Sequence, residues 1–348
     1  MGGSFQPKKF RYLSDPPVET RPFSIEVDQE KCTGCGMCVR QCPTQSIELV
    51  DKKPRFTGLP YFGKICIACH NCEAVCPTGA LVFNHFYRVD KGRWAYDFDY
   101  PEGHGDGMPN PLMTERPADF SALEDKLTPV EKVIYTRRSV RVYKDKPVPK
   151  ELIHRVLEAG RFAPSAGNCQ GWKFTVVTNK ELLNQISAST LKFLNLFTKL
   201  YQGKGPVRTF LKKTLAIVKP EGIDQRPMVA IQALLTPKFK KQPLSVFFDA
   251  PCAIFLIAHH MHISDASLDI GICAQNMVLA AHSLGLGTCY VGFVSTALKM
   301  DPATKKFWPA LGIGWPYDNP CTVLTLGYPA TRVDKAVDRE KPRVMWVE

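Results

Sequence analysis

The apolar positions in the second half of the chain follow clear helix and strand patterns. Residues 149–162 carry apolar residues at the spacing of one helix face. That face consists of Leu152, Ile153, Val156 and Leu157. Residues 250–258 (APCAIFLIA) are an uninterrupted apolar run of strand length, which predicts a buried strand. Residues 269–285 are apolar on nearly all sides, which predicts a helix buried in the core.

Further element signals surround these segments. In TPVE, Thr128 is a hydroxyl cap, Pro129 takes the first helical position and Glu131 lies three residues after the cap, which predicts a helix from Pro129 to Arg137. Turn residues then predict a loop, and KFTVV predicts a strand after it. GTCYVGF and CTVLTLGYP are strand or turn segments. Together, these helices and strands predict an α+β domain with a central sheet.

The first part of the chain has a different pattern. The short strands SIELV and ALVF each follow a cysteine-rich loop and a proline, so residues 1–89 are predicted to be a small domain with an N-terminal arm. Residues 90–126 lack periodicity and are rich in proline, glycine and aspartate, which predicts an ordered linker before a domain at 127–348. The aromatic residues expected to fix this linker to a surface are Trp94, Tyr96, Phe98 and Tyr100.

Composition places the chain among soluble proteins. Of its 348 residues, 45% are hydrophobic, and no apolar run approaches the roughly 18 residues of a membrane span. The start has no signal-peptide pattern, so we expect a cytoplasmic protein whose 13 cysteines are reduced. Cys252, Cys273 and Cys321 have apolar neighbours and are predicted to be small core residues.

Positive charge is concentrated in one segment. The net charge is +12, and residues 180–248 hold 12 Lys/Arg against 3 Asp/Glu, an excess of 12 − 3 = +9. The basic insert, at about 187–244, is predicted to be a lid over the substrate site. Two alternatives are an amphipathic surface that touches anionic lipid, as would suit a quinone substrate, and a docking surface for an acidic electron carrier. No recognised motif for nucleic acid accompanies the charge, so no such partner is expected.

The cysteines carry the first chemical signal. The pattern C-x2-C-x2-C-x3-C-P occurs twice, at 32–43 and 66–77. In this pattern the first three thiolates bind one [4Fe–4S] cluster and the fourth binds the other. The predicted ligand sets are Cys32, Cys35, Cys38 and Cys76 for one cluster, and Cys66, Cys69, Cys72 and Cys42 for the other. Two zinc sites are the disfavoured alternative.

Residues around the cysteines agree with clusters. Gly34 and Gly36 let the backbone approach inorganic sulfide closely. Residues 23–88 resemble the bacterial two-[4Fe–4S] ferredoxins on this motif. His70 lies between two ligand cysteines, and we expect a surface residue there rather than a proton-coupled one.

A cluster of arginines carries the second signal. The chain has neither a GxGxxG that follows a strand nor a phosphate-binding GxxxxGK[ST] loop. It does have RRSVR, in which Arg137, Arg138, Arg141 and Ser139 offer donors that suit a phosphate. Taken alone, this segment is typical of a solvated surface.

Four motifs in order change that interpretation. RRSVRVY, RFAPSAGNCQGWKF, GICAQNMVLAAHSLGLGTCYVG and LGYP with a late arginine resemble the nitroreductase family of flavoproteins, over about 127–348 apart from the insert. The resemblance implies bound FMN, a mixed central sheet flanked by helices, and a homodimer with the flavin at its interface. The fold class expected for the whole chain is therefore α+β, with a ferredoxin-like two-cluster domain before a nitroreductase-like FMN domain.

The resemblance also implies roles for matching residues. Arg137, Arg138, Ser139 and Arg141 would bind the FMN phosphate and its ribityl or pyrimidine edge. Pro164, Ser165, Ala166 and Asn168 would line the isoalloxazine ring, with Asn168 facing N5. Backbone groups for the flavin would come from Gly285, Leu286, Gly287 and Thr288. Arg339 would be the late phosphate arginine, with Arg343 as the alternative.

Two other features are assigned structural roles. Cys169 follows Asn168 in the ring loop, and we expect it to pack beside the ring rather than act as a redox thiol. The histidines of HHMH follow the buried strand, and exposed positions at the strand end are favoured over a metal site. Because a flavin itself carries hydride or electron chemistry, no catalytic side chain is assigned.

Both motif sets lie in one chain, which predicts the function. Single electrons from a low-potential donor such as ferredoxin would pass through two [4Fe–4S] clusters to FMN. They would reduce a small organic acceptor by two electrons: a nitro compound, quinone, enone or halogenated aromatic. The alternative is an electron-transfer module that exchanges electrons with a partner redox protein or a membrane quinone. The natural substrate and the direction of electron flow stay open at this point.

Overall fold

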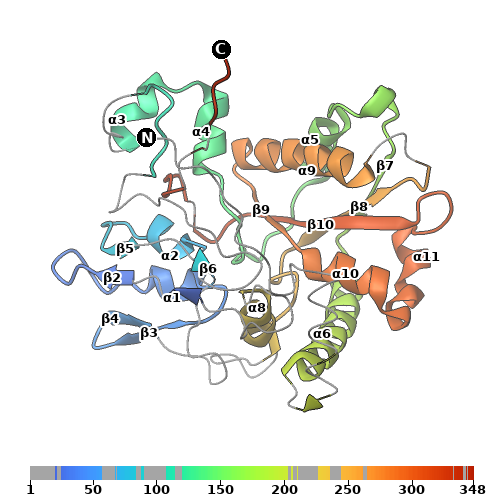
Figure 1. Cartoon of the computed structure of the whole chain (residues 1–348), viewed down its shortest axis with the longest axis horizontal. Helices are drawn as coiled ribbons and strands as arrows, with labels where there is room; N and C mark the ends of the chain where they lie inside the picture. Colours follow the sequence, from blue (N-terminus) through green and yellow to red (C-terminus); the bar gives the residue numbers. More distant parts are fainter. Residues whose placement is uncertain are drawn as a thin grey trace. The chain divides into compact units, whose positions relative to one another are not determined.

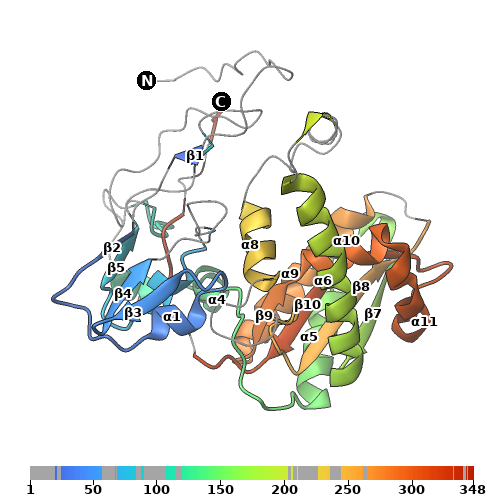
Figure 2. The same cartoon turned by 90° about the horizontal axis from the view of Figure 1, so that it is seen from below.

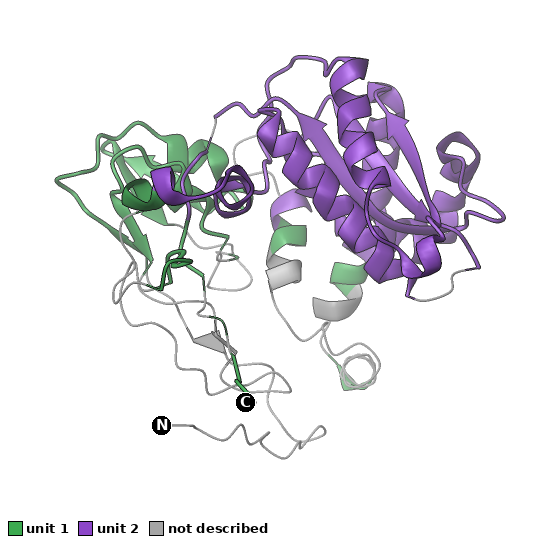
Figure 3. Ribbon diagram, turned by 90° about the horizontal axis from the view of Figure 1, so that it is seen from above, with its two compact units in different colours: residues 1–123, 197–232, 337–348 green, residues 124–196, 233–336 purple. Residues whose placement is uncertain are grey.

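The computed structural model describes most of the chain. The described residues are 20–21, 25–56, 67, 69–83, 88–89, 107–113, 120–202, 205–206, 210, 226–235, 244–261, 265–331, 333–339, 342 and 344–348. The chain divides into two compact units (Figure 3). Unit 1 comprises residues 1–123, 197–232 and 337–348, and unit 2 comprises residues 124–196 and 233–336.

A four-stranded sheet forms the centre of unit 2 (Figure 1). Its strands, in spatial order, are β7 (Trp172–Val177), β8 (Cys252–Ala258), β10 (Asn319–Gly327) and β9 (Gly287–Tyr290). All three ladders are antiparallel. Among the described residues, the parallel component expected of a mixed sheet is the isolated bridge between Ser139 and Thr288. Every residue of β8 is buried, as its apolar run predicts.

Helices cover both faces of this sheet. Helices α5 (Lys150–Arg161) and α9 (Ala266–Ser283) pack together on one face, whereas α10 (Gly292–Met300) and the start of α6 (Lys180–Gln202) lie on the other (Figure 1, Figure 2). Ile254 and Leu256 of β8 join the core beneath α5 and α9. The helices predicted at 149–162 and 269–285 are therefore confirmed as α5 and α9. Their apolar side chains cover this face of the sheet.

The capped helix is also present. Helix α4 (Pro129–Thr136) begins with a complete capping box. The Thr128 hydroxyl accepts from the Glu131 backbone N–H at 3.3 Å, and the Thr128 N–H donates to the Glu131 carboxylate at 2.8 Å. Other helices among the described residues are α3 (Phe120–Leu123), α8 (Arg226–Leu235), α11 (Trp308–Leu311) and the 3-10 helices η1 (Glu124–Lys126), η2 (Ala166–Asn168) and η4 (Pro302–Phe307).

The predicted linker contains helical structure at its end. Residues 120–126, interpreted from sequence as aperiodic, form α3 and η1, because buried Phe120 and Leu123 anchor a helical turn. The four aromatic residues predicted to pin the linker lie outside the described residues. Much of the basic insert also lies there, while α6 and α8 make up most of its described part.

Unit 1 repeats one pattern twice. Helix α1 (Met37–Gln41) is followed by β3 (Ile47–Val50), and α2 (Asn71–Ala74) by β5 (Leu81–Phe83), which confirms both predicted strands. The antiparallel pairs are β2 (Ile25–Val27) with β5, β3 with β4 (Lys53–Phe56), and β1 (Thr20–Arg21) with β6 (Arg88–Val89). Their small core contains Ile47, Ala80, Leu81 and Phe83 together with three motif cysteines, Cys38, Cys72 and Cys76.

Two of the three cysteines predicted to be core residues lie fully in the core of unit 2. Cys252 and Cys273 are buried, and burial raises the pKa of each thiol to about 12. Cys321 is half-buried, so it lies at the border of the core. Within the described part of the chain, no helix has both the length and the apolar character needed to cross a bilayer.

The close approach of α5 to α9 depends on a glycine. A Cβ at Gly160 would lie 2.7 Å from Met277 Cγ, whereas one at Gly271, on the exposed side of α9, would meet nothing within 4 Å. We therefore expect Gly160→Val to lower the free energy of unfolding by about 1–3 kcal/mol through overpacking. Gly271→Val is the matched control and should stay within about 0.5 kcal/mol of wild type. Equal effects in chemical denaturation would contradict this packing argument.

Candidate functional site

The first cysteine motif surrounds a cavity in unit 1. Its lining contains all four thiols of one predicted ligand set, namely Cys32, Cys35, Cys38 and Cys76. Cys76 belongs to the second motif, so the structure brings the fourth cysteine of one motif to the first three of the other. Cys35 is exposed and Cys38 is buried, so the cavity reaches from the surface into the core.

A second cavity has the reciprocal composition. It is lined by Cys69 and Cys72 of the second motif and by Cys42 of the first. The fourth predicted ligand, Cys66, lies outside the described residues. The two cavities thus separate the described cysteines into the two ligand sets that the sequence predicts.

Backbone geometry shapes both cavities. Gly34 and Gly36 adopt φ values of +71°, and a side chain at Gly34 would collide with the carbonyl oxygen of Lys52. The N–H of Ser46 donates to Cys42 Sγ, and that of Ala80 to Cys76 Sγ, each at 3.3 Å. Donors aimed at sulfur stabilise a thiolate ligand, so the chemistry of this donor set fits iron–sulfur clusters.

The pKa values of two of these thiols differ in direction. Burial raises the pKa of Cys38 to about 11. Burial opposes ionisation of Cys76 as well, but hydrogen bonds from the Thr78 side chain and from backbone N–H groups outweigh it and lower the pKa of that thiol. Cys76 is therefore the more readily deprotonated of the two before a metal is bound.

His70 is not the surface residue that its motif position suggested. Its side chain is 3% exposed and lies at the second cavity. The ring stacks on Phe83 with centroids 4.1 Å apart, and Nδ1 lies 2.7 Å from a Glu73 carboxylate oxygen. The expectation was wrong because the left-handed backbone at His70, with φ of 57°, allows the ring to pack into the small core.

In unit 2, the arginine motif lies against strand β9. Ser139 forms a parallel bridge with Thr288, and the Val140 N–H donates to the Thr288 carbonyl at 2.8 Å. Arg138 is buried. A Cβ at Gly287 would lie 2.6 Å from Val140 Cγ2, so glycine permits this close contact. The structure therefore brings RRSVR and GLGT together, as their assigned roles require.

Both ends of the arginine segment are fixed by partly buried hydrogen bonds. The Thr136 hydroxyl lies 3.0 Å from His282 Nε2 on α9. At the other end, the Tyr143 hydroxyl donates to the Val140 carbonyl at 2.8 Å and lies 2.7 Å from Thr325 Oγ1 on β10. Burial raises the pKa of Tyr143 well above 10, so the phenol stays neutral. Sequence reasoning missed these supports, whose partners lie far apart along the chain.

A helix terminus positions the GLGT turn. Gly285 adopts a φ of +74° directly after α9. Its N–H donates to the His282 carbonyl at 2.9 Å, and the Leu286 N–H donates to the Ala281 carbonyl at 2.9 Å. These bonds form a Schellman motif, which ends the helix and turns the chain into β9.

The APSAGN loop connects α5 to β7. The Ser165 hydroxyl accepts from the Gln170 N–H at 3.0 Å, and Asn168 Oδ1 accepts from Gln170 Nε2 at 3.2 Å. Asn168 has a positive φ of 54° and is exposed, as is Pro164, whereas Ser165 and Ala166 are half-buried. Sparsely populated backbone conformations of this kind cluster at ligand sites.

Cys169 is exposed in the same loop. Its Sγ lies 4.0 Å from a carboxylate oxygen of Asp269, which is buried in the first turns of α9. This contact ties the APSAGN loop to the beginning of α9.

Within one chain, the APSAGN loop and the arginine segment lie at opposite ends of the sheet. The loop enters β7 at Trp172, which pairs with Ala258, whereas Thr288 lies at the level of Leu326 and Cys252. The six residue steps from Cys252 to Ala258 correspond to about 20 Å. Helix α9 gives the same result, because its contacts to the two segments, at Asp269 and His282, are about 20 Å apart at 1.5 Å per residue.

The late phosphate arginine has two candidates from the sequence, Arg339 and Arg343. Arg339 belongs to unit 1, where its exposed side chain follows a backbone N–H that donates to the Gly107 carbonyl at 2.8 Å. Its alternative, Arg343, lies outside the described residues. The structure thus leaves the late phosphate arginine unassigned.

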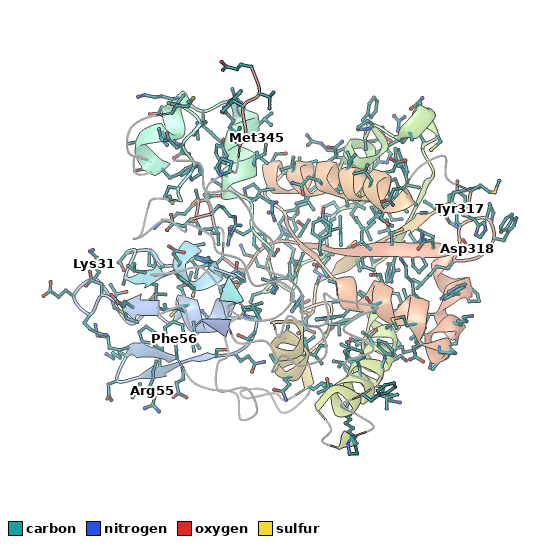
Figure 4. All side chains as sticks on the ribbon, viewed as in Figure 1. Lys31, Arg55, Phe56, Tyr317, Asp318 and Met345 are labelled. Atoms are coloured by element: carbon teal, nitrogen blue, oxygen red, sulfur yellow. The ribbon has the colours of Figure 1, made fainter. Side chains whose placement is uncertain are left out.

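The histidines after β8 lie at a strand end, as predicted. His260 is exposed and its Nδ1 lies 3.0 Å from a carboxylate oxygen of Asp318, which Figure 4 labels beside Tyr317. His259 is half-buried against the Tyr317 ring, with centroids 5.0 Å apart. His262 lies outside the described residues, and the described His259 and His260 do not belong to a group of three side chains that could hold a metal ion.

Comparison with known proteins matches two separate segments of the chain to two different families. Residues 134–328, more than half of the chain, match the model of the nitroreductase family, and residues 31–80 match that of the 4Fe-4S dicluster domain. A solved nitroreductase with bound FMN from Desulfitobacterium hafniense is 24% identical, with a TM-score of 0.45. That likeness covers 64% of this chain and 100% of the other.

Two curated relatives are also named as nitroreductases. The chain is 30% identical over 215 residues to an Archaeoglobus fulgidus protein provisionally named NADH dehydrogenase/NAD(P)H nitroreductase, covering 61% of this chain and 92% of that one. It is 23% identical over 206 residues to the chloronitrobenzene nitroreductase of Comamonas testosteroni, covering 53% and 86% respectively. With an α+β sheet domain and a cysteine-lined first unit, the chain belongs to the nitroreductase family of oxidoreductases and carries an additional 4Fe-4S dicluster domain.

Proposed function

We propose that this chain is an iron–sulfur flavoprotein oxidoreductase that relays single electrons through two [4Fe–4S] clusters to FMN. The observation that carries the proposal is the presence, in one chain, of two cavities with exchanged cysteine sets and a nitroreductase domain. Cubane clusters exchange one electron at a time, whereas reduction of an organic acceptor by a flavin needs two.

Membership of the family supports the proposed substrate class. Relatives are named for chloronitrobenzene and nitrobenzene reduction. The proposed acceptor is accordingly a small organic molecule: a nitro compound, quinone, enone or halogenated aromatic. A low-potential donor such as ferredoxin would supply the electrons. The second candidate, an electron-transfer module for a partner redox protein or a quinone, is favoured by the basic insert with its excess of +9 over residues 180–248.

The residues of the chain have separate proposed roles in holding the flavin. FMN, when bound, supplies the hydride or electron chemistry. Arg137, Arg138, Arg141 and Ser139 would bind its phosphate and its ribityl or pyrimidine edge, on a segment that hydrogen bonds join to β9 and β10. The backbone of the GLGT turn would contact the flavin. Pro164, Ser165, Ala166 and Asn168 would line the ring, with Asn168 at N5.

Two chains are needed to complete one such site. The ring loop and the phosphate segment of one chain are about 20 Å apart, measured along β8, which is too far for a single FMN to place its N5 at one and its phosphate at the other. In a homodimer with two-fold symmetry, the loop of one chain can meet the arginine segment of its partner. We therefore propose two equivalent flavin sites, each built from both chains.

Cofactor content tests the function directly. After anaerobic reconstitution, we expect about eight iron atoms and one FMN per chain. Iron analysis, metal analysis for zinc and release of the flavin by denaturation provide the measurement. Zinc in place of iron, with no flavin, would exclude the proposal.

The exchange of the fourth cysteines makes a spectroscopic prediction. Cys42→Ser and Cys69→Ser should change the EPR signal of the same reduced cluster, and Cys76→Ser and Cys35→Ser that of the other, each with loss of up to about four iron atoms. Exposed Cys169→Ser is the matched control and should leave both signals intact. If Cys42→Ser instead altered the cluster changed by Cys35→Ser, the proposed ligand sets would be wrong.

Mixed dimers test the two-chain flavin site. One chain carries Arg137→Gln and Arg141→Gln, and the other carries Asn168→Gly, which preserves the positive φ. Neither variant alone should retain FMN, but a purified mixed dimer should bind about one FMN per two chains, because one site receives only wild-type segments.

The reciprocal mixture is the control. A chain with all three substitutions is paired with a wild-type chain, and this dimer should bind no FMN because each site has one damaged side. If each chain held a complete site of its own, the first mixture would bind none and the second would bind about one FMN.

A further inference from the structure

We propose that Lys53 raises the reduction potential of the cluster held by Cys32, Cys35, Cys38 and Cys76. This inference rests on the proposed function, because it requires both clusters. It assigns a tuning role to a lysine that the cysteine motifs do not include, and the expected effect is confined to one cluster.

Lys53 holds the loop that contains the first cluster ligand. It lies at the start of β4, on the hairpin that also carries Arg55 and Phe56 (Figure 4). Its Nζ donates to the carbonyl of Gln29 at 2.7 Å and to that of Cys32 at 2.8 Å. The side chain is half-buried, so its charge is fixed beside a ligand residue rather than moving freely in solvent.

The hairpin keeps this contact in place. The Lys52 carbonyl lies so close to Gly34 that a Cβ there would collide with it. Leu49 and Pro54, from the two strands of the hairpin, line the same cavity as the four thiols. The ammonium group is therefore held by the hairpin next to this cavity.

Arg40 adds a second positive charge to the same loop. Its Nη1 donates to the Cys35 carbonyl at 3.2 Å, and its Nη2 lies 2.9 Å from Met37 Sδ. Arg40 is exposed, so water and salt screen its charge more strongly than that of Lys53. Lys53 is accordingly the larger contribution.

The electrostatic consequence has a definite sign. Reduction adds one electron and hence one negative charge to a cluster. A nearby ammonium group stabilises the more negative form, and the half-buried position strengthens this effect relative to bulk water. Lys53 therefore makes the reduction of its cluster more favourable and raises its potential.

The described residues of the second motif offer no counterpart to this lysine. Residues 67 and 69–83 include no lysine or arginine and one acid, Glu73. Glu73 places a carboxylate oxygen 2.7 Å from His70 Nδ1, and His70 lines the second cavity. The two halves of unit 1 are thus similar in backbone pattern but different in charge.

Redox titration of the full-length holoprotein, monitored by EPR, tests the proposal. Lys53→Met and Lys53→Gln should each lower the midpoint potential of one cluster, the one whose signal Cys35→Ser alters, and leave the other unchanged. Glutamine keeps a hydrogen-bond donor without the charge, so it separates charge from loop support. Lys53→Arg should retain the wild-type potential. Lys52→Met is the matched control, since it removes an exposed charge one residue away and should change neither potential.

Three results would overturn the inference. The first is an unchanged midpoint potential of this cluster in Lys53→Gln. The second is an equal change in the potentials of both clusters, and the third is the same change in Lys52→Met. Iron content, measured on every variant, distinguishes this failure from that of the proposed function. A wild-type protein without about eight iron atoms refutes the clusters themselves, whereas full iron content with unshifted potentials refutes only the role of Lys53.

Discussion

The antiparallel register of strand β8 is the constraint on which the sheet domain depends. Every residue of this strand is buried, and it pairs with β7 on one side and β10 on the other. Because this pairing fixes β7 and β10 along the length of β8, segments that lie at the two ends of β8 are separated by the full length of that strand. The APSAGN loop enters β7 at the level of Ala258 and the GLGT turn enters β9 at the level of Cys252, so their separation is a property of the sheet and not of loop conformation.

The small unit applies a similar principle at shorter range. Two copies of one loop, helix and strand pattern exchange their last cysteines, so neither motif can complete a cavity by itself. The shared backbone plan makes the two cavities alike in ligands. The differences arise from residues outside the motif, such as the lysine on the β3–β4 hairpin and the buried His70–Glu73 pair.

Local patterns predicted much of this structure. The apolar run at 250–258, the capping box at Thr128 and the cysteine spacing each depend on residues close in sequence, and each corresponds to an observed strand, helix or cavity lining. The ferredoxin-like and nitroreductase-like parts were recognisable for the same reason.

Features that depend on distant partners could not be predicted. The Tyr143–Thr325 contact joins residues 182 positions apart, and the Lys53–Cys32 contact joins residues 21 apart without any motif. His70 was misassigned because its burial depends on stacking against Phe83. The sequence order of RRSVR and APSAGN likewise gave no sign that the two segments lie at opposite ends of one sheet.

This separation also links cofactor retention to protein concentration. In a site that needs two chains, flavin binding and chain association form a single coupled equilibrium. Dilution that separates the chains would release the flavin, and added flavin would hold the chains together. Because the length of strand β8 sets this separation, the amount of bound flavin would then depend on how many chains are associated.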